Sequence, residues 1–148
     1  MEIRKAEISD AEIIRYFQVQ MAMETEQLLL DYQIVNKGVM AVFQDSTKGS
    51  YYVAEDNTKI IASMLITREW SDWRNGNVLW FQSVYVLPEY RNKGIFKSMY
   101  NYARNLVMND QNLKGLRLYV DRSNKTAQNV YSNLGMNGEH YRIFEWMK

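Results

Sequence analysis

The sequence predicts an α/β sandwich, in which helices cover a mixed, mostly antiparallel sheet. Three observations support this fold class. Two short apolar segments with a turn between them predict a hairpin, and the next segment is apolar on both of its faces. Amphipathic helical patterns stand before and after these strands. One helical pattern lies between two strand patterns, so we expect one β-α-β crossover within the sheet.

The N-terminal part is expected to contribute an edge strand and two helices. Residues 2–6 suit a short strand. Ser9 and Glu12 have the spacing of a capping box, in which each side chain accepts a hydrogen bond from the other's backbone N–H, so a helix should begin there. The helical spacing of apolar residues breaks over residues 24–31, which predicts a turn or helix junction. A second helix should follow and end near Gln44.

The middle of the chain is expected to form three strands. Residues 50–55 and 60–67 are predicted to pair as a hairpin through the turn at residues 56–59. Residues 69–77 are predicted to form a loop that leads into the next strand, residues 78–86. These three strands should form the antiparallel part of the sheet.

The strand at residues 78–86 is the most informative of the three. Because it is apolar on both faces, we expect it to lie centrally in a sheet that helices cover on both sides. Strict alternation places Phe81 and Tyr85 on the same face. Gln82 and Ser83 interrupt the apolar run with polar side chains, which could serve a site or bond to a neighbouring strand.

The C-terminal part should alternate helices and strands. A helix is expected after Gly94, followed by a strand at residues 116–120. Residues 127–134 show another helical pattern, which Gly135 is well placed to end. Residues 136–147 are predicted to form one or two terminal strands.

Composition excludes several classes of protein and of site. The chain has 148 residues, enough for one domain with its own core, and its net charge of +1 gives no general attraction to nucleic acid or membrane. The absence of cysteine excludes disulfides and thiolate metal sites, and one histidine, His140, cannot build a histidine-rich metal site. No apolar run suits a membrane span or a signal peptide, so we expect a cytoplasmic protein without a bound metal.

A basic turn follows the central strand and opens the next helix. The first N–H groups of a helix have no partner within it, and the positive end of the helix dipole adds to their attraction for anions. Arg91, Lys93 and Lys97 add cations, and Gly94 permits a close approach to the backbone. The turn therefore predicts a phosphate-binding site. Neither the Walker pattern nor the three spaced glycines of a dinucleotide fingerprint is present.

Three segments, residues 84–95, 124–127 and 131–136, resemble the motifs of the GNAT superfamily of acetyl-CoA-dependent N-acetyltransferases. The segments read VYVLPEYRNKGI, NKTA and YSNLGM, and their order and spacing are typical of that family. The resemblance implies a single GNAT domain over residues 1–148, whose splayed central strands form the coenzyme cleft. The chain departs from the family at Phe96, where a small residue is usual, and we expect this ring to turn into the core.

The resemblance also implies roles for individual residues of the coenzyme site. The pantetheine arm of acetyl-CoA would bond to the backbone of the central strand, at Val84, Tyr85 and Val86. Asn124 would contact the same arm, and Tyr131 would protonate the departing thiolate. The diphosphate would bond to the backbone amides of six consecutive residues, namely Arg91, Asn92, Lys93, Gly94, Ile95 and Phe96.

General chemistry is consistent with these roles. An amine that attacks a thioester forms a tetrahedral oxyanion, and a backbone N–H near Val84 could stabilise it. A tyrosine hydroxyl such as that of Tyr131, with an unperturbed pKa of about 10, can protonate a thiolate of similar basicity. The amine must first lose a proton. Glu24 and Glu26 are the first candidates for its base, and Gln82 could only orient a water molecule.

One segment combines two indoles with a carboxylate between them. Trp70, Asp72 and Trp73 could bind a cationic amine through cation–π and ionic contacts. With the two candidate glutamates as neighbours, they would form a pocket for a small cationic amine. A polyamine, an amino acid or an aminated antibiotic would suit such a pocket.

Other interpretations of the same residues stay open. Tyr131 could be a core residue, Asn124 a helix cap and the tryptophans a dimer contact. Within the same fold, the acceptor could be a peptide or protein, and a module that binds acyl-CoA without turnover would also fit. A homodimer agrees with the habit of the family and with the many aromatic residues. A nucleic-acid binder is not expected, because the sequence has no basic stripe.

Overall fold

The computed structural model describes residues 1–148, which form two compact units. The first unit, Met1–Arg117, contains the whole sheet and three α-helices. The second unit, Leu118–Lys148, contains one α-helix and irregular segments. The α/β architecture that the sequence predicts is confirmed in the first unit.

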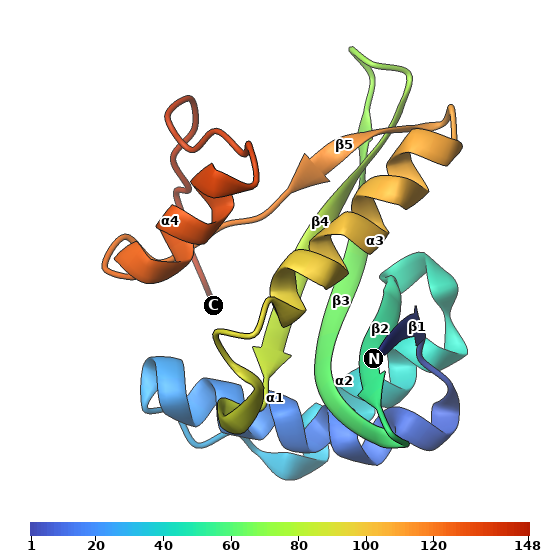
Figure 1. Ribbon diagram of the computed structural model, residues 1–148, viewed down its shortest axis with the longest axis vertical. Helices are drawn as coiled ribbons and strands as arrows, with labels where there is room; N and C mark the ends of the chain where they lie inside the picture. The colour runs from blue at the N-terminus through green and yellow to red at the C-terminus, as the bar shows by residue number, and fades with distance from the viewer. The chain divides into compact units, whose positions relative to one another are not determined.

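Five strands form the sheet: β1 (Glu2–Lys5), β2 (Ser50–Asp56), β3 (Lys59–Ser71), β4 (Gly76–Val86) and β5 (Leu113–Arg117). They lie in the order β1-β2-β3-β4-β5 (Figure 1). Neighbouring strands are antiparallel, except that β5 runs parallel to β4. A helix, α3 (Ile95–Asn109), connects these two parallel strands, so the predicted β-α-β crossover is confirmed.

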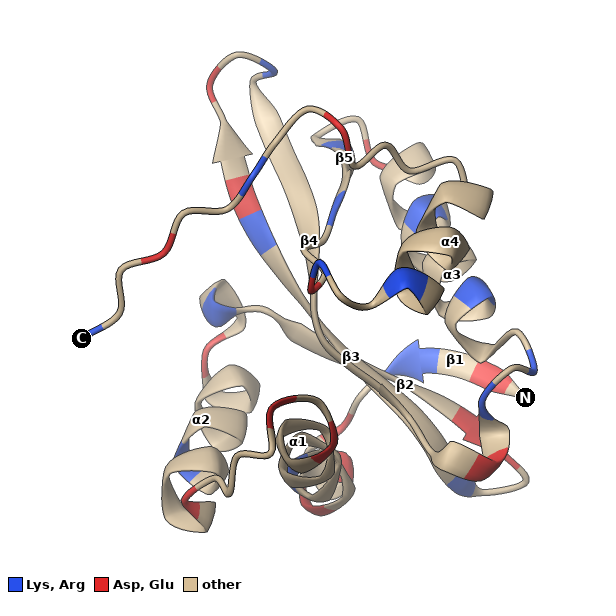
Figure 2. Ribbon diagram, turned by 90° about the vertical axis from the view of Figure 1, so that its left-hand side faces the viewer, with Lys and Arg blue, Asp and Glu red and all other residues tan.

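Helices cover both faces of the sheet. α1 (Ala11–Glu26) and α2 (Tyr32–Gln44) lie on one face, and α3 lies on the other (Figure 2). The predicted break between the first two helices is present, because Gln27 adopts a left-handed conformation with φ of 53° and Asp31 caps α2. None of the helices has both the length and the apolar character that crossing a membrane requires.

The core lies between the sheet and each helical layer. On the α1 side, Ile14 and Phe17 have no exposed surface, and Tyr85 of β4 packs against the Phe17 ring. On the α3 side, Met99 and Ala103 are likewise fully buried. Burying a side chain as large as that of Phe17 or Met99 stabilises a fold by roughly 1.5–3 kcal/mol. These two layers therefore hold β4 firmly from both sides.

A β-bulge interrupts β4 at Ser83. Gln82 pairs with Leu65 and Tyr85 pairs with Ser63, so two residues of β4 lie opposite a single residue of β3. Ser83 has φ of 49°, in the left-handed region that residues other than glycine adopt uncommonly. The bulge lies at the polar pair that interrupts the apolar run in the sequence.

The prediction that Phe81 and Tyr85 share a face of β4 is wrong. Phe81 packs against Tyr100 of α3, with ring centroids 6.2 Å apart, whereas Tyr85 packs against Phe17 of α1, with centroids 5.1 Å apart. The extra residue of the bulge shifts the alternation by one, which reverses the face of every residue that follows.

The hairpin between β3 and β4 is longer than the sequence predicts. β3 continues to Ser71, β4 begins at Gly76, and these two residues pair across the strands. The loop expected over residues 69–77 is therefore a short turn at residues 72–75, and Trp70 belongs to β3. Ladder hydrogen bonds are made by the backbone, so pairing continues through side chains that have little strand propensity.

The start of α1 also differs from the prediction. A 3₁₀ turn, Ile8–Asp10, precedes the helix, and the expected capping box between Ser9 and Glu12 does not form. The capping box joins Glu7 and Asp10 instead, because the Glu7 N–H donates to the Asp10 carboxylate at 2.8 Å.

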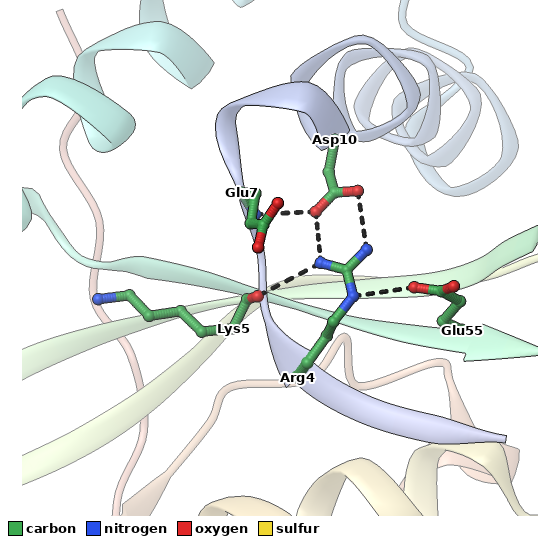
Figure 3. A network of polar contacts seen from close by, with 5 residues as sticks. All are labelled: Arg4, Lys5, Glu7, Asp10 and Glu55. Atoms are coloured by element: carbon green, nitrogen blue, oxygen red, sulfur yellow. Dashed lines mark hydrogen bonds and ion pairs between the residues drawn. The ribbon is translucent and has the colours of Figure 1, made fainter. Parts of the chain in front are cut away.

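Arg4 ties β1 to this turn (Figure 3). Its guanidinium donates to both carboxylate oxygens of Asp10, at 2.7 and 3.1 Å, and its Nε donates to Glu55 of β2 at 2.9 Å. Asp10 is only 7% exposed. Burial raises the pKa of Asp10, but the hydrogen bonds from Arg4 and from the Glu7 backbone outweigh this effect and lower the pKa below its usual value.

We expect Asp10→Asn to lower the free energy of unfolding by about 1–3 kcal/mol at pH 7, because Arg4 loses its charged partner. The pKa of Asp10 is lower in the folded state. Its stabilisation is therefore present above the unfolded value of about 3.9 and disappears as the pH falls through the folded pKa. Urea unfolding of both proteins at pH 7 and pH 2.5 measures this. If the difference in the free energy of unfolding between wild type and variant were the same at both pH values, the result would contradict this explanation.

The second unit contains α4 (Lys125–Asn133). Asn124 caps its N-terminus, and Gly135 follows its end with φ of 84°, as its place in the sequence predicts. The strands predicted over residues 136–147 are wrong, because this segment forms no ladder with any strand. The strand predicted over residues 116–120 begins three residues earlier, as β5, where it pairs with the first part of β4.

Candidate active site

The last residues of β4 have no strand partner on one side. β5 pairs with β4 only between Asn77 and Trp80, although β4 continues to Val86. On the other side, the Leu87 N–H donates to the Ile61 carbonyl at the end of the β3 ladder, at 3.0 Å. Successive residues of a strand point their backbone groups to opposite sides, so the Val86 N–H points toward the edge that β5 leaves unpaired. The Val86 carbonyl, on the same edge, accepts a hydrogen bond from the Nε of Arg91. An extended ligand could bind there as an added strand.

A basic turn connects this edge to α3. It contains a 3₁₀ turn, Pro88–Tyr90, and two residues in the left-handed region, Asn92 with φ of 60° and Gly94 with φ of 77°. No side chain caps α3, which begins at Ile95. A methyl group added at Gly94 would meet no atom within 4 Å, so the space around this residue is open. The first N–H groups of the helix and its dipole make this end of α3 suitable for a diphosphate.

The Phe96 ring lies in the layer between α3 and the sheet. Its centroid is 6.0 Å from that of Phe81 on β4, in an edge-to-face arrangement. Phe81 also packs against Tyr100, which lies one turn further along α3. The inward orientation expected for Phe96 is therefore present, and this large side chain contributes to packing.

Glu24, near the end of α1, contacts both the strand and the turn. Its Oε1 accepts a hydrogen bond from the Tyr85 hydroxyl at 2.8 Å, and its Oε2 pairs with Nη2 of Arg91 at 2.7 Å. The Nε of Arg91 donates to the Val86 carbonyl at 2.9 Å, and the guanidinium lies 5.4 Å from the centroid of the Tyr85 ring. Side chains from α1, β4 and the basic turn thus meet at the end of β4.

The Tyr85 hydroxyl is a neutral member of this network. Burial raises the pKa of Tyr85 to about 12, and the neighbouring Glu24 carboxylate adds to this effect. Tyr85 is 5% exposed and stays protonated at neutral pH. It therefore acts as a hydrogen-bond donor to Glu24.

The other candidates for the base lie in different surroundings. Glu26 is the last residue of α1 and is exposed. Gln82 immediately precedes the bulge, and its Nε2 donates to the Thr67 hydroxyl of β3 at 2.6 Å. Because an amide does not ionise, the Gln82 side-chain oxygen could only accept a hydrogen bond from a water or an amine.

The structure does not bring the tryptophan segment to this end of β4. Trp73 lies in the hairpin turn before β4 and Trp70 precedes it on β3, whereas Glu24 contacts Tyr85 near the other end of β4. The hairpin turn and α1 lie at opposite ends of β4 (Figure 1). A strand rises about 3.3 Å per residue, so the two ends of β4 are up to roughly 30 Å apart. Asp72 accepts the Trp73 N–H at 2.9 Å, and Trp73 is 89% exposed. A pocket that combines these residues with Glu24 and Glu26 is therefore not formed within one chain, and the exposed indoles suit a contact with another molecule better.

Asn124 and Tyr131 lie in the second unit. The Oδ1 of Asn124 accepts the Ala127 N–H at 3.0 Å, so Asn124 is a helix cap, which was one of the two interpretations of this residue. Burial raises the pKa of Tyr131 above its usual value, so its hydroxyl stays protonated at neutral pH. A general acid requires this protonated form.

The side-chain network around Glu24 was not predicted from the sequence. Its partners Tyr85 and Arg91 are 61 and 67 residues away along the chain, so no local pattern connects them. The resemblance assigns Tyr85 a backbone role only. The β-bulge is different, because a polar pair inside an apolar strand is a local signal that could have revealed it.

Comparison with protein families identifies the class of this chain. Residues 16–136 match the model of the acetyltransferase (GNAT) family. The match crosses the boundary between the two units and includes all three segments that resemble GNAT motifs. No curated protein matches the chain.

Solved structures share the fold. The chain is 44% identical to a protein from Clostridium difficile 630 described as a possible acetyltransferase, with a TM-score of 0.92 over 99% of this chain and 97% of that chain. It is 17% identical to a predicted acetyltransferase with acetyl-CoA from Clostridium acetobutylicum, with a TM-score of 0.75 over 97% of this chain and 95% of that chain. It is 14% identical to AAC(6')-Iy in complex with the bisubstrate analogue CoA-S-monomethyl-acetylneamine, with a TM-score of 0.77 over 99% and 97% of the two chains. The last two likenesses show the fold alone. With the family match and the first of these structures, the chain belongs to the GNAT family of acetyltransferases.

Proposed function

We propose that the protein is an N-acetyltransferase that transfers an acetyl group from acetyl-CoA to a primary amine of a small cationic molecule. The observation that carries this proposal is the unpaired end of β4, which leads through the basic turn into the uncapped N-terminus of α3. This arrangement offers a strand edge to the pantetheine arm and a helix end to the diphosphate. Membership of the acetyltransferase family supports the same activity.

The coenzyme would bind along two successive segments of the first unit. Residues 84–86 would bond to the pantetheine arm through their backbone, and the amides of residues 91–96 would bond to the diphosphate. The open space at Gly94 and the inward Phe96 ring fit this assignment. One protein of the same fold was crystallised with acetyl-CoA and another with a CoA-containing bisubstrate analogue, which supports acetyl-CoA as the donor.

The reaction is proposed to be a direct attack of the amine nitrogen on the thioester carbonyl. The new N–C bond forms while the carbonyl electron pair moves to oxygen, and the C–S bond breaks when this tetrahedral intermediate collapses. The bulge at Ser83 interrupts the ladder with β3, so an N–H near Val84 could stabilise the oxyanion. From the resemblance, Tyr131 would give its proton to the thiolate and Asn124 would contact the pantetheine arm.

The amine must lose a proton before it attacks. Gln82 lies beside the bulge and could orient a water molecule that accepts this proton. Glu26 is the acidic candidate whose carboxylate lies in solvent. Glu24 is not assigned this role, because both of its oxygens are engaged by Tyr85 and Arg91.

Acidic residues support a cationic acceptor. Glu26 and Asp31 are exposed at the junction of α1 and α2, whereas Glu24 is already paired with Arg91 of the basic turn. A peptide or protein acceptor is the alternative within the same chemistry, and acyl-CoA binding without turnover is the alternative outside it. We further propose that the protein acts in the cytoplasm as a homodimer, with the exposed Trp70 and Trp73 as candidates for the contact between copies.

Acetyl-CoA and a panel of acceptors test the proposal. We expect CoA release with polyamines or aminoglycosides and no release without an acceptor. Because the chain has no cysteine, a thiol reagent detects the released CoA alone. Release with peptides only would favour a peptide acceptor, and thermal stabilisation by acetyl-CoA without any release would identify a binding module. If acetyl-CoA gives no thermal stabilisation and no CoA is released with any acceptor, the proposal is rejected.

A further inference from the structure

We propose that Glu24 positions the Arg91 guanidinium for the diphosphate of the coenzyme, and that it is not the base for the amine. This inference rests on the proposed function, because it concerns the same coenzyme site. It is carried by the 2.7 Å ion pair between Glu24 and Arg91 and by the 2.9 Å hydrogen bond from Arg91 to the Val86 carbonyl. Together these contacts hold one cation of the basic turn at the end of β4.

Arg91 is held from three sides. Glu24 accepts from Nη2, Val86 accepts from Nε, and the guanidinium lies over the Tyr85 ring. A long, flexible side chain that is already ordered loses less entropy when it binds an anion. The Arg91 side chain keeps 41% of its surface exposed, so it stays accessible to a ligand. Arginine has five N–H groups, and the two contacts use only part of this set.

Tyr85 holds Glu24 in turn. The Tyr85 hydroxyl donates to Glu24 at 2.8 Å, and its buried ring packs against Phe17 in the core. This donor stays protonated over the whole neutral range, because burial and the carboxylate raise the pKa of Tyr85 to about 12. The core thus fixes the Tyr85 ring, the Tyr85 hydroxyl restricts the Glu24 carboxylate, and Glu24 in turn restricts Arg91.

The same contacts make Glu24 unsuitable as a base. One of its oxygens accepts from Tyr85 and the other pairs with Arg91. A proton taken from the amine would neutralise the carboxylate and leave Arg91 without its counter-ion. A general base also needs an oxygen that reaches the amine directly or through one water.

Removing the carboxylate has two opposing effects on anion binding. Glu24→Gln makes the turn more positive, which favours an anion, but it also releases Arg91, which must then become ordered on binding. Both partners are partly exposed, so water and salt screen the change in charge. We therefore expect the loss of order to dominate and the affinity for CoA to fall by about 3- to 10-fold.

Calorimetric titration with CoA and steady-state kinetics with acetyl-CoA test the inference. Glu24→Gln should weaken CoA binding and raise the KM for acetyl-CoA by this factor, with kcat and its pH profile within about twofold of the wild type. Glu12→Gln makes the same charge change in the exposed first turn of α1 and should leave all of these values unchanged. In an Arg91→Ala background, Glu24→Gln should have no further effect on CoA affinity, because Arg91 is its link to the coenzyme.

Two results would overturn the inference. Equal or tighter CoA binding by Glu24→Gln would show that Arg91 needs no positioning. A hundredfold fall in kcat with loss of the acidic limb of the pH profile would show that Glu24 is the base. If Glu24→Gln does not fold, Glu24→Asp replaces it in the test, because aspartate keeps the charge but is too short to reach Arg91. This variant should also raise the KM for acetyl-CoA and leave kcat nearly unchanged. A wild type that does not bind CoA would reject the proposed function itself.

Discussion

Replacing Gly94 by alanine should weaken CoA binding at least tenfold and leave the protein folded. At φ of 77°, an added Cβ strains the backbone by about 1–2 kcal/mol. Because the Cβ meets no atom within 4 Å, this strain is the only cost to the unliganded fold. In the complex, the same methyl group would occupy space through which the diphosphate approaches the start of α3. Calorimetric titration with CoA measures the loss.

Gly135→Ala is the matched control for this variant. Gly135 has φ of 84°, an added Cβ meets no atom within 4 Å, and the residue follows the end of α4 in the second unit. Its replacement should lower the unfolding temperature about as much as Gly94→Ala does, with unchanged affinity for CoA. If both variants lost the same affinity for CoA, the cause would be backbone strain in general and not the place of Gly94 in the basic turn.

Tyr131→Phe should lower kcat by about 10²-fold or more, with little change in the KM for acetyl-CoA. Under the proposed mechanism, the variant would lose the proton donor for the departing thiolate, and general acid catalysis contributes typically about 10²–10⁴-fold. Burial raises the pKa of Tyr131 above its usual value of about 10, so the acid form persists up to that pH. The wild-type kcat should therefore show no alkaline decline from this group below about pH 10. Steady-state rates from pH 6 to pH 10 measure both effects.

Tyr141→Phe is the control for the loss of a hydroxyl. Tyr141 is in the same unit and 80% exposed, and its replacement should leave kcat within about twofold of the wild type. Tyr131→Phe with a normal kcat but a lower unfolding temperature would favour the other interpretation of Tyr131, a core residue without a role in the reaction.

The course of β4 shows what a single sequence can and cannot predict. Its apolar residues on both faces correctly predict a strand that helices cover on both sides, but β4 is the fourth of five strands and its last residues have no partner on one side. Alternation fails at Ser83, since a bulge adds a residue without changing the apolar pattern around it. Residues 136–147 show the converse error, because a strand-like pattern becomes a strand only where another backbone pairs with it.

The backbone parts of the candidate site follow from local rules, and its side-chain contacts do not. The turn after β4 and the ends of the helices near Gly94 and Gly135 depend on φ and on helix geometry, which the residue types reveal. The pair of Glu24 and Arg91 depends on how α1 packs across β4, and the place of Trp73 depends on how far the β3–β4 ladder extends. Both are set by packing and by backbone hydrogen bonds between distant segments.

A structure of the protein with bound CoA tests the central claim most directly. The account predicts diphosphate oxygens at about 2.7–3.2 Å from backbone nitrogens within residues 91–96, with the pantetheine arm along the unpaired edge of β4 at Val86. A complex in which the coenzyme lies elsewhere, or in which the Phe96 ring has left Phe81 and fills the turn, would contradict it.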